Sequence, residues 1–193
     1  MNPDLILASG SKYRHELLVR LRYPFRVLSP DIDESVLPHE TPIETCMRLA
    51  REKALAVARL NPDSIVIGSD QVADVNGVAI SKPGNHENAQ KQLAAMSGQR
   101  IVFHSAVCVA RQNTGQCEVF VVPTTVEFRE LNADEIERYL LAEKPYDCAG
   151  SAKSEGLGIT LLKRIESTDP TSIIGLPLIE LAATLRRFNL TLP

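Results

Sequence analysis

The stretch S-I-V-I-G-S-D-Q-V, at residues 64–72, decides the fold of this 193-residue chain. Its apolar centre is a short uninterrupted hydrophobic run, which is typical of a buried strand. We expect this strand at Ser64–Gly68, with Ser69, Asp70 and Gln71 directly past its C-terminal end. Open α/β sheets bind ligands in the crevice beyond the carboxyl ends of their strands. Asp70 is therefore a candidate functional residue, although an Asx turn would give it a purely structural role.

Helix and strand signals on both sides of this stretch predict an α/β fold with a mixed, twisted sheet flanked by helices. In order, the expected elements are a strand at 5–8, a helix at 14–21, a strand at 25–28, a helix at 43–60, a hairpin of 72–75 with 78–80, a helix at 87–96, long strands at 101–110 and 117–128, a helix at 132–141, a strand at 159–165 and a helix at 178–188. Asn76-Gly77 is a strong antiparallel hairpin signal, so the sheet is mixed and not all parallel. We expect residues 1–193 to form a single domain, built as one body or as two closely packed lobes around a central cleft.

The overall composition is that of an ordinary globular protein. Apolar residues make up 44% of the chain, and the formal net charge is −3. This charge gives no electrostatic attraction for nucleic acid or anionic membranes, and every apolar run is far shorter than the ~20 residues of a membrane-spanning helix. The four cysteines form no C-x-x-C pair, so we expect reduced thiols. With no signal-peptide pattern at the start, a cytoplasmic protein is expected.

Ser9-Gly10-Ser11 and Arg14 form a candidate phosphate site at the start of the first helix. Hydroxyls and free backbone N–H groups at a helix N-terminus suit a phosphate, and an arginine on the first turn can bind it in a bidentate manner. Serine is also a preferred capping residue, so a plain N-cap is the alternative role for Ser9 and Ser11.

Two lysines and a glycine-rich segment are further candidates. Lys53 falls among apolar residues of the long helix, where a lysine either extends its ammonium to solvent or meets an anion. Lys82 follows the predicted hairpin and is placed to close over the same crevice. Residues 149–158, A-G-S-A-K-S-E-G-L-G, allow close backbone approach to a ligand and project Glu155 from a tight loop. They match no standard phosphate-loop pattern, so a structural turn is the alternative.

Several short motifs in a fixed order make the chain similar to the Maf family of nucleotide pyrophosphatases. They are L-A-S-G-S-x-x-R (7–14), D-E (33–34), E-K-A (52–54), G-S-D-Q-V (68–72), S-K-P (81–83) and A-G-S-x-K-S-E-G-x-G (149–158). Their order and spacing fit from Leu5 to about Leu178. The resemblance implies a fold shared with inosine triphosphate pyrophosphatases, a divalent cation as cofactor, often a homodimer, and Asp70 as proton acceptor.

Within that family the chain is most similar to the YceF subfamily, which is associated with 7-methyl-GTP pyrophosphatase activity. Tyr13, Gln71 and Glu155 carry this assignment. The related dTTP/UTP pyrophosphatases resemble S-D-T at the second of these places and have Gln at the third. The opening differs from the usual S-x-S-P-[WR]-R-R pattern, because Lys12 replaces the proline, Tyr13 the tryptophan and His15 the second arginine.

The resemblance implies hydrolysis between the α and β phosphates of a nucleoside triphosphate. Displacement at phosphorus needs charge neutralisation and an oriented water. The groups expected around the phosphates are Ser9, Ser11, Arg14, Lys53 and Lys82. Glu34 and Asp70 are expected to hold the divalent cation, which is Mg²⁺, Mn²⁺ or Co²⁺, and Asp70 also to act as general base.

The same reasoning extends to the nucleobase. N7-methylguanine carries a positive charge, which an electron-rich ring and a nearby carboxylate favour. We expect Tyr13 to supply the ring, Glu155 to accept from the N1–H and N2–H edge, and Gln71 to contact the remaining edge. One alternative is a dTTP/UTP or broad-specificity pyrophosphatase. An alternative of another class is a non-catalytic regulator of septation that acts through a binding partner.

Overall fold

The computed structural model describes residues 3–192 and confirms an α/β fold built on one mixed sheet. Within these residues the sheet has seven strands in the order β2-β1-β3-β5-β6-β7, with β4 paired to β3. The strands are β1 (Leu5–Ala8), β2 (Arg26–Val27), β3 (Ile65–Val75), β4 (Val78–Ile80), β5 (Arg100–Arg111), β6 (Gln116–Phe128) and β7 (Leu162–Ser167). The α-helices are α1 (Lys12–Val19), α2 (Pro42–Leu60), α3 (His86–Met96), α4 (Ala133–Glu143) and α5 (Leu178–Arg187). Short 3₁₀ segments are η1 (Gln112–Thr114), η2 (Ala149–Ser151), η3 (Leu157–Leu161) and η4 (Ser172–Ile174).

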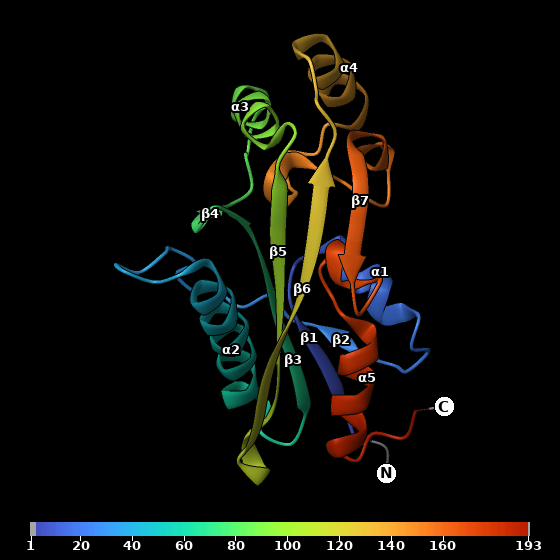
Figure 1. Cartoon of the computed structure of the whole chain (residues 1–193). Helices are drawn as coiled ribbons and strands as arrows, with labels where there is room; N and C mark the ends of the chain where they lie inside the picture. Colours follow the sequence, from blue (N-terminus) through green and yellow to red (C-terminus); the bar gives the residue numbers. More distant parts are fainter. Residues whose placement is uncertain (1–2, 193) are drawn as a thin grey trace.

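The helices cover different parts of the sheet. Figure 1 shows the long hairpin of β5 and β6 running the length of the molecule, with α2 on one side, α1 and α5 on the other, and α3 and α4 at the far end. Side chains alternate across β1, so Leu5 and Leu7 join the cluster under α5, whereas Ile6 and Ala8 join the cluster under α2. A further cluster around Phe103 fastens α3 and α4 to the far end of the sheet.

The start of α2 follows the sequence signals closely. Thr41 accepts from the Glu44 N–H, and the Glu44 carboxylate accepts from the Thr41 N–H, which completes a capping box with Pro42 at the first helical position. The helix then runs along β3 with almost no gap, because Gly68 has no side chain. A Cβ at Gly68 would lie 2.2 Å from the Ala50 carbonyl oxygen. This close approach brings the middle of α2 next to the middle of β3.

The prediction that the central strand ends at Gly68 is wrong. β3 continues through Asp70 to Val75, so Asp70 lies inside the strand and not past its end. The reason is the neighbouring strand: β5 pairs with β3 from Val66 to Asp74, whereas β1 pairs with it only as far as Gly68. Asp70 therefore lies beyond the C-terminal end of β1, where one side of β3 has no strand beside it.

A second correction concerns the strand expected at 159–165. Its first part forms the 3₁₀ segment η3, and β7 begins only at Leu162. Within the segment, Ile159 N–H donates to the Gly156 carbonyl at 3.3 Å, a local turn that an apolar run does not reveal. None of the helices in residues 3–192 has the length and apolar character needed to cross a membrane.

Candidate active site

All the candidate residues named from the sequence line one cleft. The cleft holds about 710 Å³ and is lined by residues at the end of β1 and in the 148–155 segment. The candidate residues in its wall are Ser9, Ser11, Tyr13, Arg14, Glu34, Lys53, Asp70, Gln71, Lys82 and Glu155. They come from widely separated parts of the chain, so their meeting is a property of the fold and not of sequence proximity.

Lys53 forms the centre of the cleft floor. Its Nζ donates to Asp70 Oδ1 at 2.7 Å and lies 2.9 Å from Glu34 Oε1. Lys53 and Asp70 are only 6% and 7% exposed, and ion pairs this deep are tolerated only when both charges have partners. Burial raises the pKa of Glu34, but the hydrogen bond and charge of Lys53 outweigh that effect, so the pKa lies below its ordinary value. The lysine thus meets anions instead of extending to solvent.

The backbone beneath Asp70 is supported by a buried thiol. Cys46 on α2 shares its single S–H between the Asp70 carbonyl at 3.2 Å and the His104 carbonyl at 3.0 Å. Burial, with the nearby Asp70 charge, raises the pKa of the Cys46 thiol to about 12, so the group stays neutral. The cysteines are free thiols, as expected from the sequence.

The serine loop is hydrogen-bonded to Arg14, which in turn donates to Gly175. Ser11 caps α1 by accepting from the Arg14 N–H at 3.4 Å, and Ser9 Oγ accepts from Arg14 Nη1 at 3.3 Å. The Gly175 carbonyl accepts from Arg14 Nε at 3.0 Å and from Ser69 Oγ at 3.1 Å. Within residues 3–192 no hydrogen bond from Arg14 Nη2 is present. Two of the three guanidinium nitrogens are thus engaged by Gly175 and Ser9, and Nη2 is left to donate to a ligand.

Lys82 makes fewer polar contacts within residues 3–192 than the other two cations named from the sequence, Arg14 and Lys53. It is exposed in the segment between β4 and α3, and within the described residues it makes no ion pair. Its charge nevertheless contributes to lowering the pKa of Glu34. Gly84, two residues later, adopts a φ of +73° and donates to the Tyr146 carbonyl at 3.0 Å, which holds this segment over the cleft.

Tyr13 lies at the rim of the cleft among charged groups that sequence reasoning missed. Its hydroxyl donates to Asp147 Oδ1 at 3.2 Å, while the Lys12 and Lys153 ammonium groups lie 4.8 and 5.8 Å from the ring centroid. Burial raises the pKa of Tyr13, and the neighbouring thiol of Cys148 adds to the shift. The ring is therefore a surface that already attracts cations.

The two remaining specificity candidates differ in how firmly they are held. The Gln71 side-chain nitrogen donates to Ser105 Oγ at 2.9 Å and to the Ser172 and Ile173 carbonyls at 3.1 and 3.0 Å. This nitrogen is fully engaged in fixing η4, so only the Gln71 carbonyl oxygen is left for a base edge. Glu155, in contrast, is exposed, and within the described residues its one hydrogen bond is from Ser154 at 3.5 Å.

The loop that presents Glu155 is fastened to α4. Glu143, the last residue of α4, accepts from Lys153 Nζ at 2.8 Å and from the Leu157 N–H at 2.7 Å. Tyr139 Oη accepts from the Lys153 N–H at 3.0 Å and donates to the Ser151 carbonyl at 3.1 Å. The glycine-rich segment is therefore an ordered rim of the cleft.

The fit of a divalent cation rests on two carboxylates. Within residues 3–192 there is no group of three or more His, Cys, Asp or Glu side chains able to hold a metal ion. Glu34 and Asp70 nevertheless face one point, where both contact the Lys53 ammonium. Mg²⁺ is commonly bound by one or two carboxylates together with substrate oxygens and water, so this pair fits an ion that arrives with a phosphate ligand.

Comparisons with known proteins cover nearly the whole chain. A family model described as "Maf-like protein" matches residues 4–188. The chain is 52% identical to a protein named 7-methyl-GTP pyrophosphatase from Ralstonia nicotianae, over 98% of this chain and 97% of the relative. Proteins of the same name from Bordetella avium and Pseudomonas syringae pv. tomato are 55% and 51% identical, over 98% and 99% of this chain and 95% and 100% of theirs. Among solved structures, a HAM1 protein from Coxiella burnetii aligns with a TM-score of 0.43 at 16% identity, over 65% of this chain and 73% of that one.

Proposed function

This chain belongs to the Maf-like protein family, and from that premise we propose that it is a pyrophosphatase that converts 7-methyl-GTP to 7-methyl-GMP and pyrophosphate. The names of the full-length relatives support the substrate. The observation that carries the chemistry is the buried contact of Lys53 with Asp70 and Glu34 on the floor of the cleft. A floor that combines a fixed cation with two carboxylates suits cleavage of a phosphoanhydride.

We propose that the phosphates bind between the serine loop and the lysines. Ser9, Ser11, Arg14, Lys53 and Lys82 all line the cleft. These donors and cations would neutralise the charge that develops on phosphoryl oxygens during displacement. A triphosphate would therefore be bound by the cleft itself, although the whole chain carries a net charge of −3.

Asp70 is the proposed general base. Its Oδ1 is held by Lys53 at 2.7 Å, while no hydrogen bond to its Oδ2 is present among residues 3–192. The free oxygen can accept the proton of a water that attacks phosphorus, and the held oxygen fixes the plane of the carboxylate. Such general-base assistance is typically worth about 10²- to 10⁴-fold in rate.

Glu34 and Asp70 are the proposed holders of a divalent cation, together with substrate oxygens. A bound Mg²⁺, Mn²⁺ or Co²⁺ would supply Lewis-acid polarisation of a phosphoryl oxygen. Lys53 would keep the two carboxylates in place before the ion and substrate arrive, since its ammonium contacts both of them.

The base pocket is proposed at the rim formed by Tyr13 and Glu155. The Tyr13 ring already attracts the ammonium groups of Lys12 and Lys153, which supports stacking of a positively charged methylguanine. Glu155 would accept from the N1–H and N2–H groups, and Gln71 would offer its carbonyl oxygen. A single domain over residues 1–193, a homodimer and a cytoplasmic location remain predictions from the sequence.

A nucleotide panel tests the function. Purified protein is incubated with 7-methyl-GTP, GTP, dTTP or UTP and with Mg²⁺, Mn²⁺ or Co²⁺, and released pyrophosphate is measured. We expect the highest kcat/KM for 7-methyl-GTP. A higher value for dTTP or UTP would contradict the base pocket, and no release from any nucleotide with any of the metals would favour a non-catalytic binding role.

A further inference from the structure

Glu34 lies in a long loop without regular secondary structure. Between β2 and α2, residues 28–41 form only a turn at 38–39, and most of them are exposed. The Glu34 carboxylate nevertheless reaches the buried Lys53 ammonium at 2.9 Å. A loop with no hydrogen-bonded ladder of its own needs contacts from elsewhere to hold a carboxylate at a fixed place.

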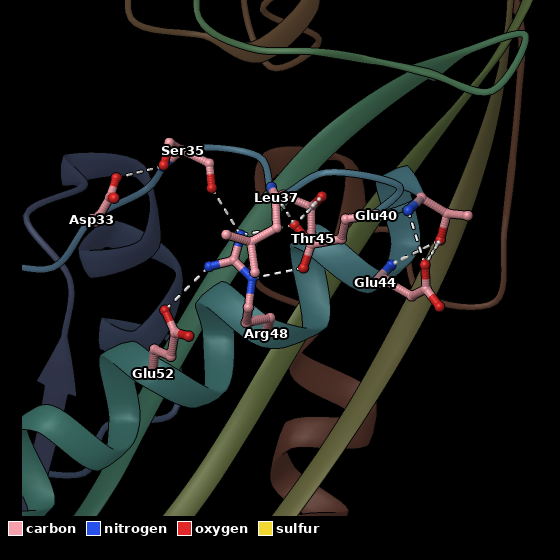
Figure 2. Close-up of polar contacts among 9 residues, drawn as sticks. Asp33, Ser35, Leu37, Glu40, Glu44, Thr45, Arg48 and Glu52 are labelled. Carbon is pink, nitrogen blue, oxygen red and sulfur yellow. Dashed lines mark hydrogen bonds and ion pairs between the residues drawn. The ribbon is translucent and has the colours of Figure 1, made fainter.

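Arg48 on α2 provides these contacts through all three guanidinium nitrogens (Figure 2). Its Nε and Nη2 donate to the two carboxylate oxygens of Glu40 at 2.6 and 2.8 Å, a bidentate arrangement that lysine cannot form. Nη2 also donates to the Ser35 carbonyl at 2.9 Å, and Nη1 to Glu52 at 3.2 Å. The Arg48 and Glu40 side chains are 19% and 9% exposed, so solvent screens this pair only weakly.

These contacts fix the backbone directly beside Glu34. The Ser35 N–H donates to Asp33 Oδ1 at 2.9 Å, while the Ser35 carbonyl is held by Arg48. Both backbone polar groups of Ser35, the residue that follows Glu34, are therefore bound, as Figure 2 shows.

Glu40 extends the same network along the loop. Besides Arg48, it accepts from the Leu37 N–H at 3.1 Å and from Thr45 Oγ1 at 2.9 Å. Arg48 and Glu40 thus fasten the loop to α2 at two places, and neither side chain lines the cleft.

We propose that Arg48 is a positioning residue that holds the Glu34 carboxylate beside Lys53 and Asp70, an inference that rests on the proposed function. It acts by gripping Ser35 and Glu40, and it touches neither substrate nor metal. Substitution of a residue that orients a metal-binding carboxylate typically lowers metal affinity or activity about 10- to 100-fold.

Arg48→Lys tests the proposal because it keeps the positive charge and removes the planar guanidinium that makes two hydrogen bonds to Glu40. The matched control is Arg51→Lys, an exposed arginine on the same helix. With 7-methyl-GTP and Mg²⁺, we expect kcat to fall about 10-fold in Arg48→Lys and to stay unchanged in Arg51→Lys, with KM altered less than kcat. Equal kcat values for the two variants would overturn the positioning role.

A double-mutant cycle shows whether the effect passes through Glu34. In a Glu34→Gln background we expect Arg48→Lys to lower kcat by less than about 2-fold, since coupled residues are not additive. The same fold loss in both backgrounds would mean that Arg48 acts on overall folding, and the proposal would be wrong.

Calorimetric titration with Mn²⁺ in the presence of 7-methyl-GMP, whose phosphate completes the proposed cation site, supplies a measurement that does not depend on turnover. We expect Arg48→Lys to weaken Mn²⁺ binding about 10-fold and Arg51→Lys to bind as the unaltered protein does. Unchanged binding in Arg48→Lys, or no binding by the unaltered protein, would overturn the proposal. Failure of the proposed function would give a different result: the protein would still bind Mn²⁺ but would release no pyrophosphate from any nucleotide.

Discussion

Lys53 illustrates how a single residue gains its role from burial. The ammonium of a lysine on an apolar helix face either extends to solvent or binds an anion, and the sequence alone leaves both possibilities open. In the structure Lys53 is 6% exposed and contacts both Asp70 and Glu34. A cation this deep is stable only with close anionic partners, so the packing of α2 on β3 selects the second outcome.

Asp70→Asn should nearly abolish turnover and leave the fold intact. The amide keeps the size and one acceptor for Lys53 but cannot take a proton from water, so kcat should fall about 10²- to 10⁴-fold. Pyrophosphate release and a thermal melt measure the two properties. Asp74→Asn, on the same strand but outside the cleft wall, is the control. Turnover near that of the control would contradict the assignment of Asp70 as base.

Glu155→Gln should weaken the preference for the methylated base. The positive charge of 7-methylguanine distinguishes it from guanine, and an exposed carboxylate contributes up to about 1 kcal/mol to such an attraction. The ratio of kcat/KM for 7-methyl-GTP to that for GTP should therefore fall roughly 5-fold. Glu87→Gln, an exposed change on α3 outside the cleft wall, should leave the ratio unchanged. An unchanged ratio in Glu155→Gln would remove Glu155 from the base pocket.

Residue motifs predicted which side chains share the cleft, but not the groups that surround them. Asp147 reaches Tyr13 across more than 130 positions of sequence and belongs to none of the motifs, whereas Lys153 stands in the glycine-rich motif without any predicted contact to Tyr13. Gln71 was predicted to contact the base, but its side-chain nitrogen already donates to Ser105 and to η4. Contacts made through the tertiary fold leave no local signal.

At the scale of elements, caps and turns were predictable because their causes are local. Thr41-Pro42 begins α2, and Asn76-Gly77 joins β3 to β4, with φ values of +52° and +85° at the turn. The length of β3 was not predictable from its own residues. It depends on β5, whose pairing continues to Asp74 after β1 has ended.

Gly68→Ala should separate α2 from β3. The new Cβ would lie 2.2 Å from the Ala50 carbonyl oxygen and 2.4 Å from the Ala54 nitrogen, and both obstacles are backbone atoms. We expect the free energy of unfolding to fall by about 3 kcal/mol or more, as for severe overpacking. Urea unfolding measures this loss. Adding Ala54→Gly should not restore stability, because it removes only a side-chain contact. Full recovery in the double variant would contradict the backbone clash.

For the whole molecule, stability should decrease in acid. The hydrogen bonds from Arg48 lower the pKa of Glu40 from 4.5 to about 2, despite an opposing effect of burial. The unfolded chain therefore binds more protons between these values, so this contribution is full above about pH 4.5 and is lost as the pH falls towards 2. Urea unfolding at several pH values should give a shallower pH dependence for Glu40→Gln. An identical dependence in both proteins would contradict the lowered pKa.

The sheet that carries these elements also determines how the cleft can change shape. β5 and β6 run unbroken past the cleft, and β3 is paired with β5 along most of its length. A continuous ladder of this kind resists bending, so a rotation of one end of the sheet against the other is not the expected way for the cleft to change shape. Under the proposed function, a nucleotide would enter and leave through the mouth of the existing cleft. Product release would then not have to wait for a rotation of domains.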